Sequence, residues 1–414
     1  MDNKRLLIIG HVWPEPQSSA AGSRTLQLIS FFQKNSWHIT FVTPAAESEN
    51  AVDLSKLSVT YQRVKINDSS FNQLLLQLNP QCVLFDRYLT EEQFGWRVEE
   101  VCPEAIRILD TIDLQCLRNA RHDALKTGEK VEELLLQSEI TKREIASVYR
   151  CDLSLIISSY EMELLEDTFQ IDNSLLMYLP FMMEEITEKD KEGWKGYNER
   201  EHFVTIGNFM HAPNWDAVLL LKERVWPIIR DTLPAAQLHI YGAYPTQKVF
   251  DLNQPKDGFI VKGRADDVNE VMSNARVCIA PLRFGAGLKG KLVDAISNGT
   301  PSVTTSIGVE GMQGDNEWPG AVEASIENIA QQSVKLYYSK EAWEEAQSRC
   351  STIVNSEFNK EHHEERFLMQ MNMLIRNLNS HRSNNFIGAM LKHHHHKSTK
   401  YMSRWIEEKN KIKQ

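Results

Sequence analysis

The sequence predicts an α/β protein of two domains, each a doubly wound parallel sheet covered by helices, with a central cleft between them. Two observations predict this class. The chain of 414 residues exceeds the roughly 250 to 300 residues at which one hydrophobic core usually stops growing. Short aliphatic runs also alternate with longer helical patterns, which is typical of parallel sheets covered by helices. The content of 42% apolar and 25% charged residues fits a folded globular protein.

Six short runs rich in aliphatic and β-branched residues predict the strands of the first domain. Helical patterns separate these runs, as expected of parallel strands joined by crossovers. After the sixth run the sequence turns polar and contains glycine, and we place the domain boundary there, between 189 and 201. The predicted strands are 5–9, 38–42, 82–85, 106–109, 153–158 and 175–179.

The second half repeats this alternation with five further strands and ends in a helical pattern over 359–378. Ligands of doubly wound sheets usually bind at the carboxyl ends of the strands, which here face the cleft. The predicted strands are 203–206, 238–241, 259–261, 277–280 and 302–305. The predicted organisation is a first domain 1–190, a second domain 191–358, a terminal helix 359–380 and a basic tail 381–414.

The formal net charge of -10 argues against a general affinity for nucleic acid, which requires a basic face. The tail 381–414 is the exception, because it holds eight Lys or Arg against Glu407 and Glu408 and leaves about -16 for the remainder. We interpret it as a solvated basic tail. Peripheral docking on an anionic membrane surface through Trp405 and Ile406 is the alternative.

Six widely spaced cysteines without a C-x-x-C pair predict buried, reduced thiols and a cytoplasmic protein. The apolar run 6–9 is too short for a signal peptide, and no window of ~18 apolar residues is present. The run His393–His396 has a metal-binding composition, although an interrupted affinity tag or a solvated run is the preferred interpretation. The cysteines are Cys82, Cys102, Cys116, Cys151, Cys278 and Cys350.

The stretch 279–296 predicts a buried strand, a glycine-bearing loop and a helix. Glycines allow close approach of the backbone to a ligand, and the start of a helix favours a phosphate group. Arg283 and Lys291 add full positive charges at the same place. Lys291 and Asp294 lie three residues apart, so both side chains point from one helical face.

Three interpretations of these glycines stay open on spacing alone. Gly285, Gly287 and Gly290 satisfy G-x-G-x-x-G, but residues 282–284 separate this dinucleotide pattern from its strand. The same stretch satisfies the P-loop spacing, yet Leu292 stands where a magnesium-binding Ser or Thr is required. The third interpretation is a tight turn without a ligand.

Taken in chain order, a set of motifs resembles family 4 glycosyltransferases of the GT-B fold, in the branch with an Arg-x-Gly-x-Gly donor loop. The resemblance covers most of the chain. It implies two Rossmann-like domains and a terminal helix that crosses back to the first domain. The motifs are Pro281–Lys291 with Asp294-Ala295, 298–305, 308–311, 204–217, 238–242, 261–264 and 151–158 with Glu161.

The resemblance implies a hexosyltransferase that moves a sugar from a nucleotide-sugar, UDP- or GDP-linked, to an unidentified glycan, lipid-linked or protein acceptor. It implies retention of anomeric configuration and no cofactor. The sequence contains no D-x-D motif, so we expect no metal, and Lys, Arg and helix dipoles would stabilise the leaving diphosphate instead.

The resemblance also assigns site residues. Lys291, Arg283 and Asp113 are expected to be catalytic, and His11, Trp13, Arg24 and Asp86 to line the acceptor side. The residues expected to bind the donor are Gly22, Gly207, Asn208, Gly263, Arg264, Gly285, Ala286, Gly287, Leu288 and Asp294.

Two positions depart from the family pattern. Ala286 occupies the place of a donor-loop glutamate, and Ile112 the place of a histidine that helps to position the reacting sugar. Two alternatives therefore stay open. One is a nucleotide-sugar epimerase of the same architecture, and the other is a catalytically inactive binding partner.

Overall fold

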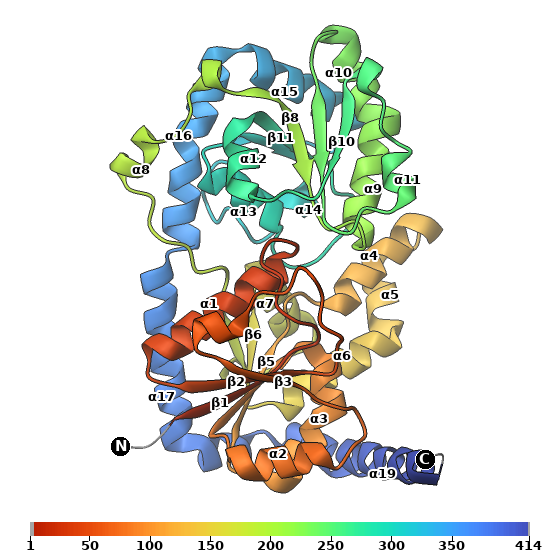
Figure 1. The fold of residues 1–414 in the computed structure, drawn as a ribbon, viewed down its shortest axis with the longest axis vertical. Coiled ribbons are helices and arrows are strands. Elements are labelled where there is room, and N and C mark those ends of the chain that lie inside the picture. The colour runs from red at the N-terminus through yellow and green to blue at the C-terminus, as the bar shows by residue number, and fades with distance from the viewer. Residues whose placement is uncertain (1–3, 413–414) are drawn as a thin grey trace.

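The computed structural model describes residues 4–412 and contains two wholly parallel sheets, each covered by helices (Figure 1). The seven-stranded sheet has the order β3-β2-β1-β4-β5-β6-β7, and the six-stranded sheet the order β10-β9-β8-β11-β12-β13. The predicted fold class is confirmed. Residues 1–3, before the apolar run 6–9, and residues 413–414, at the end of the predicted basic tail, lie outside the described residues.

The first sheet is formed by seven strands and is packed between α1 on one side and α3, α4 and α6 on the other. Strands β4, β5 and β6 are buried at every position, which explains their largely aliphatic character. The strands are β1 (Arg5–Ile9), β2 (His38–Thr43), β3 (Thr60–Arg63), β4 (Cys82–Asp86), β5 (Ile106–Asp110), β6 (Leu153–Ile156) and β7 (Leu176–Tyr178). The helices are α1 (Ala20–Lys34), α2 (Ser70–Leu78), α3 (Arg87–Val101), α4 (Gln115–Thr127), α5 (Val131–Gln137), α6 (Glu139–Arg150) and α7 (Ser159–Glu163).

The second sheet follows the polar stretch in which the domain boundary was placed. Its strands are β8 (Glu201–Ile206), β9 (Leu238–Tyr241), β10 (Phe259–Gly263), β11 (Ala275–Ala280), β12 (Ser302–Thr304) and β13 (Gly320–Val322). The helices of this half are α8 (Glu188–Glu192), α9 (Ala212–Leu220), α10 (Trp226–Thr232), α11 (Gln247–Phe250), α12 (Val268–Asn274), α13 (Gly290–Ser297), α14 (Ser306–Val309), α15 (Ile326–Tyr338) and α16 (Lys340–Glu357).

Both sheets reverse their winding direction in the middle. In the first, β1 lies between β2 and β4, and in the second, β8 lies between β9 and β11. Ligands of doubly wound sheets bind in the crevice beyond such a switch point, at the carboxyl ends of the two strands. The fold therefore places two switch points in the chain, one between β1 and β4 and the other between β8 and β11.

The last helices return to the first domain. α17 (Lys360–Asn384) follows α16 and runs along the first sheet's helical layer (Figure 1). The ring of Phe367 stacks on Phe31 of α1 at 4.5 Å, and Met371 and Leu374 are buried in the same core. The predicted terminal helix that crosses back to the first domain is confirmed.

The predicted solvated tail is wrong, because its described residues form two helices that dock on the first domain. These are α18 (Phe386–Leu391) and α19 (Lys397–Ile412), joined by a π-helical turn over Lys392–His396. Lys400 Nζ lies 2.8 Å from a carboxylate oxygen of Glu100, and His396 is buried 3.6 Å from Glu91. No helix within residues 4–412 is long and apolar enough to cross a membrane.

Candidate functional site

The loop 281–289 connects β11 to α13 and is nearly all buried. We call it the β11–α13 loop. Gly285 and Gly287 both have φ values in the region that favours glycine, +157° and +61°. A Cβ at Gly287 would also lie 2.8 Å from the Cβ of Asp113 in the first domain. Glycine is therefore required at 287 by its backbone conformation and by the close approach of the other domain.

The first domain holds this loop through two side chains. Arg121 of α4 donates from Nη1 to the carbonyl of Gly285 at 2.9 Å and makes a bidentate ion pair with Glu310, at 2.7 and 2.6 Å. Glu161 of α7 accepts the backbone N–H of Gly287 at 2.8 Å. Its Oε1 also accepts the N–H of Leu114, at 2.9 Å, so one buried carboxylate bridges the two domains.

Two lysines flank the start of α13. Lys289 is buried and donates from Nζ to the carbonyl of Gly287 at 2.5 Å, whereas Lys291 donates to Oδ1 of Asn214 at 2.7 Å. Burial lowers the pKa of each lysine to about 8. Burial also raises the pKa of Asp294, one turn after Lys291, to about 7.

Two helices begin at the switch point of the second sheet without side-chain caps. α9 follows β8 and has His211 as its N-cap, and α13 follows β11 and has Lys289 as its N-cap; neither side chain bonds to the helix's first turn. The hydrogen bond from Lys291 to Asn214 joins these first turns. Free N–H groups and a helix dipole make such a start favourable for an anion.

Arg283 takes a different position from Lys291. Its side chain is 43% exposed and forms an ion pair with Asp216 of α9, with Nε 2.9 Å from Oδ2. The carboxylate of Asp216 already balances its charge in this structure, and raises the pKa of the guanidinium through their hydrogen bond. The catalytic role expected for Arg283 requires the exchange of Asp216 for a ligand.

Asp113 follows β5 and lies against Gly287 of the β11–α13 loop. It forms an ion pair with Arg118 of α4. Burial alone would raise the pKa of Asp113, but Arg118 and then Arg87 outweigh it and keep the pKa below its usual value. The residue before it, Ile112, has φ +64°, which is strained for a β-branched side chain.

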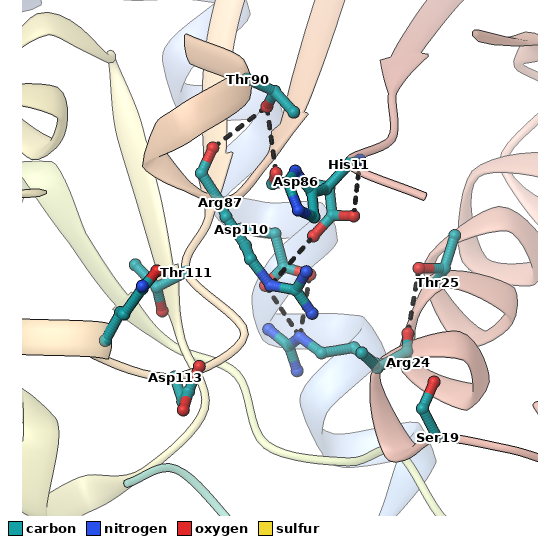
Figure 2. A network of polar contacts seen from close by, with 12 residues as sticks. His11, Ser19, Arg24, Thr25, Asp86, Arg87, Thr90, Asp110, Thr111 and Asp113 are labelled. Carbon is teal, nitrogen blue, oxygen red and sulfur yellow. Dashed lines mark hydrogen bonds and ion pairs between the residues drawn. The ribbon is translucent and has the colours of Figure 1, made fainter. Parts of the chain in front are cut away.

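The switch point of the first sheet carries a second polar cluster, in which His11 follows β1 and Asp86 ends β4. Figure 2 shows the side chains of His11, Asp86, Arg87 and Asp110 gathered at these strand ends. Oδ2 of Asp86 accepts the backbone N–H of His11 at 2.9 Å. Oδ1 accepts no hydrogen bond from the described chain and lies 3.8 Å from Nε of Arg87. Arg87 has φ +70°, so strained backbone and an unsatisfied buried oxygen coincide here.

Two of the expected acceptor-side residues are buried in the domain instead. Arg24 is 1% exposed and bonds to both oxygens of Asp110, at 2.8 and 3.0 Å, and to the carbonyl of Leu179. Trp13 is 6% exposed, packs against Phe41 and donates to a backbone carbonyl. The ring of Trp13 belongs to the core of the first domain, and its role on the acceptor side stays a prediction. Arg24 thus joins the end of β5 to the segment after β7. Of its three guanidinium nitrogens, only Nη2 has no hydrogen-bond partner within the described residues.

The starts of α1 and α13 lie against each other where the two domains meet. A Cβ at Gly290 would lie 2.6 Å from the Cβ of Ala20. Gly22, expected to bind the donor, packs so closely on Glu15 that a Cβ there would lie 2.4 Å from its backbone carbon. Ser19 caps α1 by accepting the N–H of Gly22 at 3.1 Å. Gly22 thus fixes the path of the loop before α1.

The remaining predicted donor residues lie at strand ends of the second sheet. Gly207 and Asn208 follow β8, and the Nδ2 of Asn208 lies 3.5 Å from the carbonyl of Ser18 in the first domain. Gly263 ends β10 with φ +79°. Arg264 is partly exposed, with its guanidinium 4.0 Å from Asp266. Ala286 and Leu288 are buried within the β11–α13 loop.

Several residues at this site were not predicted from the sequence. Arg118 and Arg121 lie one turn apart in α4, a helix without any motif, and only tertiary structure brings them to the cleft. Lys289 belongs to the glycine-bearing stretch, but the glycine spacing selected only Lys291. Within residues 4–412, no group of three or more His, Cys, Asp or Glu is arranged to hold a metal ion.

Comparison with known proteins agrees with this geometry. Residues 200–338 match the family model described as Glycosyl transferases group 1. Comparison with curated protein sequences found no significant match. Among solved structures, sucrose-phosphate synthase from Thermosynechococcus elongatus is 14% identical with a TM-score of 0.66, and the alignment covers 91% of this chain and 99% of that chain.

Two further structures show the same fold. TarM is 11% identical with a TM-score of 0.68, over 89% of this chain and 99% of that chain; a solved mutant of TarM comes from S. aureus. HepE from Anabaena, in complex with UDP and glucose, is 10% identical with a TM-score of 0.62, over 90% and 100% of the two chains. The fold is GT-B, with a second domain that matches the group 1 glycosyl transferases. Together these findings support a glycosyltransferase.

Proposed function

We propose that the chain is a metal-independent hexosyltransferase that takes a sugar from a UDP- or GDP-linked donor and transfers it, with retention, to an acceptor held by the first domain. One observation carries the proposal. The uncapped starts of α9 and α13 meet at the switch point of the second sheet, joined by Lys291, close to Asp113 and Arg118 of the first domain. HepE in complex with UDP-glucose supports a nucleotide-sugar donor.

The donor diphosphate would bind at the first turn of α13. Its oxygens would accept the free N–H groups there and an ammonium hydrogen of Lys291, which would exchange its bond to Asn214 for one to phosphate. When the bond between the anomeric carbon and the phosphate oxygen breaks, negative charge develops on that oxygen. A fixed cation and a helix dipole at this position stabilise the charge without reorganisation.

The donor sugar would lie between the β11–α13 loop and Asp113, which would accept a hydrogen bond from a sugar hydroxyl. Asp294 would accept one from the ribose. The acceptor would enter over His11, Asp86 and Arg87 at the switch point of the first sheet. Its oxygen forms the new bond to the anomeric carbon on the face that the phosphate leaves, and its proton passes to the departing phosphate oxygen.

The comparisons favour a transferase over the two alternatives, a nucleotide-sugar epimerase and an inactive binding partner. The acceptor stays open among a glycan, a lipid-linked sugar and a protein. We also propose that the enzyme works in the cytoplasm. The six cysteines are all free and buried, which is typical of proteins from a reducing compartment.

A thermal-shift panel tests the donor assignment. A ligand that binds only the folded state raises the melting temperature, because it stabilises that state by RT ln(1 + L/Kd), where L is the free ligand concentration. We expect UDP or GDP, and one of their sugars, to stabilise the protein, with ADP as the comparison nucleotide. Incubation with the stabilising donor alone then separates the alternatives, because an epimerase would isomerise the sugar and a transferase would not. Failure of every nucleotide to raise the melting temperature would contradict the proposal.

A further inference from the structure

The helices α18 and α19 carry a run of large apolar side chains that face solvent. Tyr401 is 66% exposed, Trp405 63% and Ile412 86%. Single exposed apolar residues are ordinary on protein surfaces, whereas a cluster on one element marks an interaction surface. The exposed apolar residues of the two helices are Phe386, Ile387, Met390, Tyr401, Met402, Trp405 and Ile412.

Three of these side chains, Tyr401, Trp405 and Ile412, share one side of α19, which we call the outer face. At 3.6 residues per turn, positions 401, 405 and 412 fall within a narrow sector of the helix. The opposite side is fixed to the first domain. Ser403 is buried and accepts from Nη2 of Arg97 at 3.3 Å, and Glu407 accepts the backbone N–H of Ser69 at 3.0 Å. The docking contacts therefore hold the outer face toward solvent. Ile406 is half-buried, so only Trp405 of the predicted docking pair points outward.

The charge of this segment is opposite to that of the rest of the chain. Residues 386–412 contain six Lys or Arg against Glu407 and Glu408, whereas residues 1–380 carry about -16 by difference. Lys409 lies over the ring of Trp405, 4.9 Å from its centroid, so a cation adjoins the outer face. Exposed apolar side chains beside positive charges match a partner that has a negatively charged surface and an apolar interior.

We propose that the outer face of α19 docks on an anionic membrane surface, with the helix axis parallel to the bilayer. Tyr and Trp are the residues that favour the boundary between headgroups and acyl chains, and neighbouring cations bind anionic headgroups. Lys409 beside an aromatic ring can extend its stem along apolar surface and keep its ammonium group at the headgroups.

This location leaves the enzyme's cleft free. α19 runs along the end of the first domain that is distant from the second domain (Figure 1). The second domain therefore moves without obstruction while the first is held at the surface. The inference is independent of the proposed transfer reaction and does not require a lipid-linked acceptor.

Vesicle flotation with the full-length chain tests the proposal. Removal of the whole tail is unsuitable, because α19 supplies partners to Arg97 and Glu100 and its loss disturbs the first domain. The variant is instead Tyr401→Glu/Trp405→Glu, which changes only exposed side chains. The control is Met369→Glu/Met373→Glu, which adds the same charge at exposed apolar positions of α17. Circular dichroism confirms that both variants fold.

We expect the parent chain to float with vesicles of equal parts phosphatidylglycerol and phosphatidylcholine, less at high salt, and hardly at all with phosphatidylcholine alone. Tyr401→Glu/Trp405→Glu should reduce the floated fraction by at least about tenfold, and the control should not. Equal flotation of parent and variant, or none of the parent, would overturn the proposal. A dimer of the parent that the variant converts to monomers, without flotation, would assign the face to a second copy instead.

Discussion

The backbone N–H of Gly287 in the β11–α13 loop donates a 2.8 Å hydrogen bond to Oε1 of Glu161 in the first domain. This contact joins the loop with the proposed donor site to the domain with the proposed acceptor site. The same oxygen accepts the N–H of Leu114, at the start of α4. The position of the loop therefore depends on how the two domains are closed.

Replacement of Gly287 should be far more damaging than replacement of another glycine with positive φ. Gly287→Ala adds a Cβ 2.8 Å from that of Asp113, whereas Gly128→Ala adds one with nothing within 4 Å. Both variants carry the backbone strain of an alanine at φ above +60°, roughly 1 kcal/mol. We expect Gly128→Ala to keep normal transfer and Gly287→Ala to lose most of it, measured as kcat/KM. Similar activity of the two variants would show that the close approach is not needed.

Lys291→Ala should reduce turnover by about 10² to 10³-fold, since removal of one preorganised charge at a developing anion has this effect. The folded state should change little, because within residues 4–412 the Nζ of Lys291 donates a hydrogen bond to Asn214 alone. The measurement is single-turnover transfer with thermal unfolding in parallel. Lys335→Ala, an exposed lysine of α15, is the control for loss of one charge. Near-normal turnover of a folded Lys291→Ala enzyme would refute the role.

Activity should fall as the pH rises through about 8. Burial lowers the pKa of Lys291 to about 8, so above that pH the ammonium group loses the proton that phosphate requires. Lys291→Arg retains a positive charge at high pH. Its alkaline limb should therefore move upward by at least one pH unit, even if the maximal rate is lower. An unchanged limb in Lys291→Arg would assign the titration to another group, such as Lys289.

Glu161 should make stability depend on pH. Burial raises its pKa from the ordinary 4.5 to about 7. The folded protein therefore binds this proton more tightly than the unfolded chain does. The resulting stabilisation is complete below about pH 4.5 and is lost as the pH rises through 7. The free energy of unfolding should therefore decline by roughly 2 to 3 kcal/mol across this pH window. Glu161→Gln, which mimics the neutral carboxyl group, should remove that decline.

Urea unfolding at pH 5 and pH 8 measures that decline. The exposed Glu163, in the same helix, supplies the control Glu163→Gln, which should behave like the parent protein. Parallel pH profiles for Glu161→Gln and the parent protein would contradict the predicted linkage.

Arg121→Ala should open the cleft. It removes the bond to the carbonyl of Gly285 and leaves Glu310, 13% exposed, without its bidentate partner. Truncation of one partner in such an ion pair costs roughly 2 kcal/mol or more. This loss destabilises only the closed arrangement, in which the two domains are in contact. We expect a larger radius of gyration in solution scattering and a higher KM for the donor. Arg143→Ala removes an exposed ion pair to Glu92 within the first domain and should do neither.

Much of the fold follows from the sequence because its strands are buried on both faces and read as continuous aliphatic runs. Eleven predicted strands correspond to strands of the structure within a few residues. The two that were missed, β3 and β13, lie at sheet edges. All four residues of β3 are exposed, and β13 has only three residues, so neither carries a hydrophobic signal.

The tail was misjudged for a related reason. Its composition indicates a charged, solvated segment, but its helices are held by specific partners such as Glu91, Arg97 and Glu100, which lie some 300 positions earlier. The same limit applies to the site. Lys291 was found because it follows glycines at a recognisable spacing, whereas Arg118 and Arg121 were missed. Spacing within one helix does not reveal which loop packs on it from another domain.

A crystal structure with a bound nucleoside diphosphate tests the donor site most directly. We expect phosphate oxygens to lie within hydrogen-bond distance of Lys291 Nζ and of the first N–H groups of α13, on the side that faces Asp113. A nucleotide bound elsewhere, with Lys291 still on Asn214, would contradict this expectation.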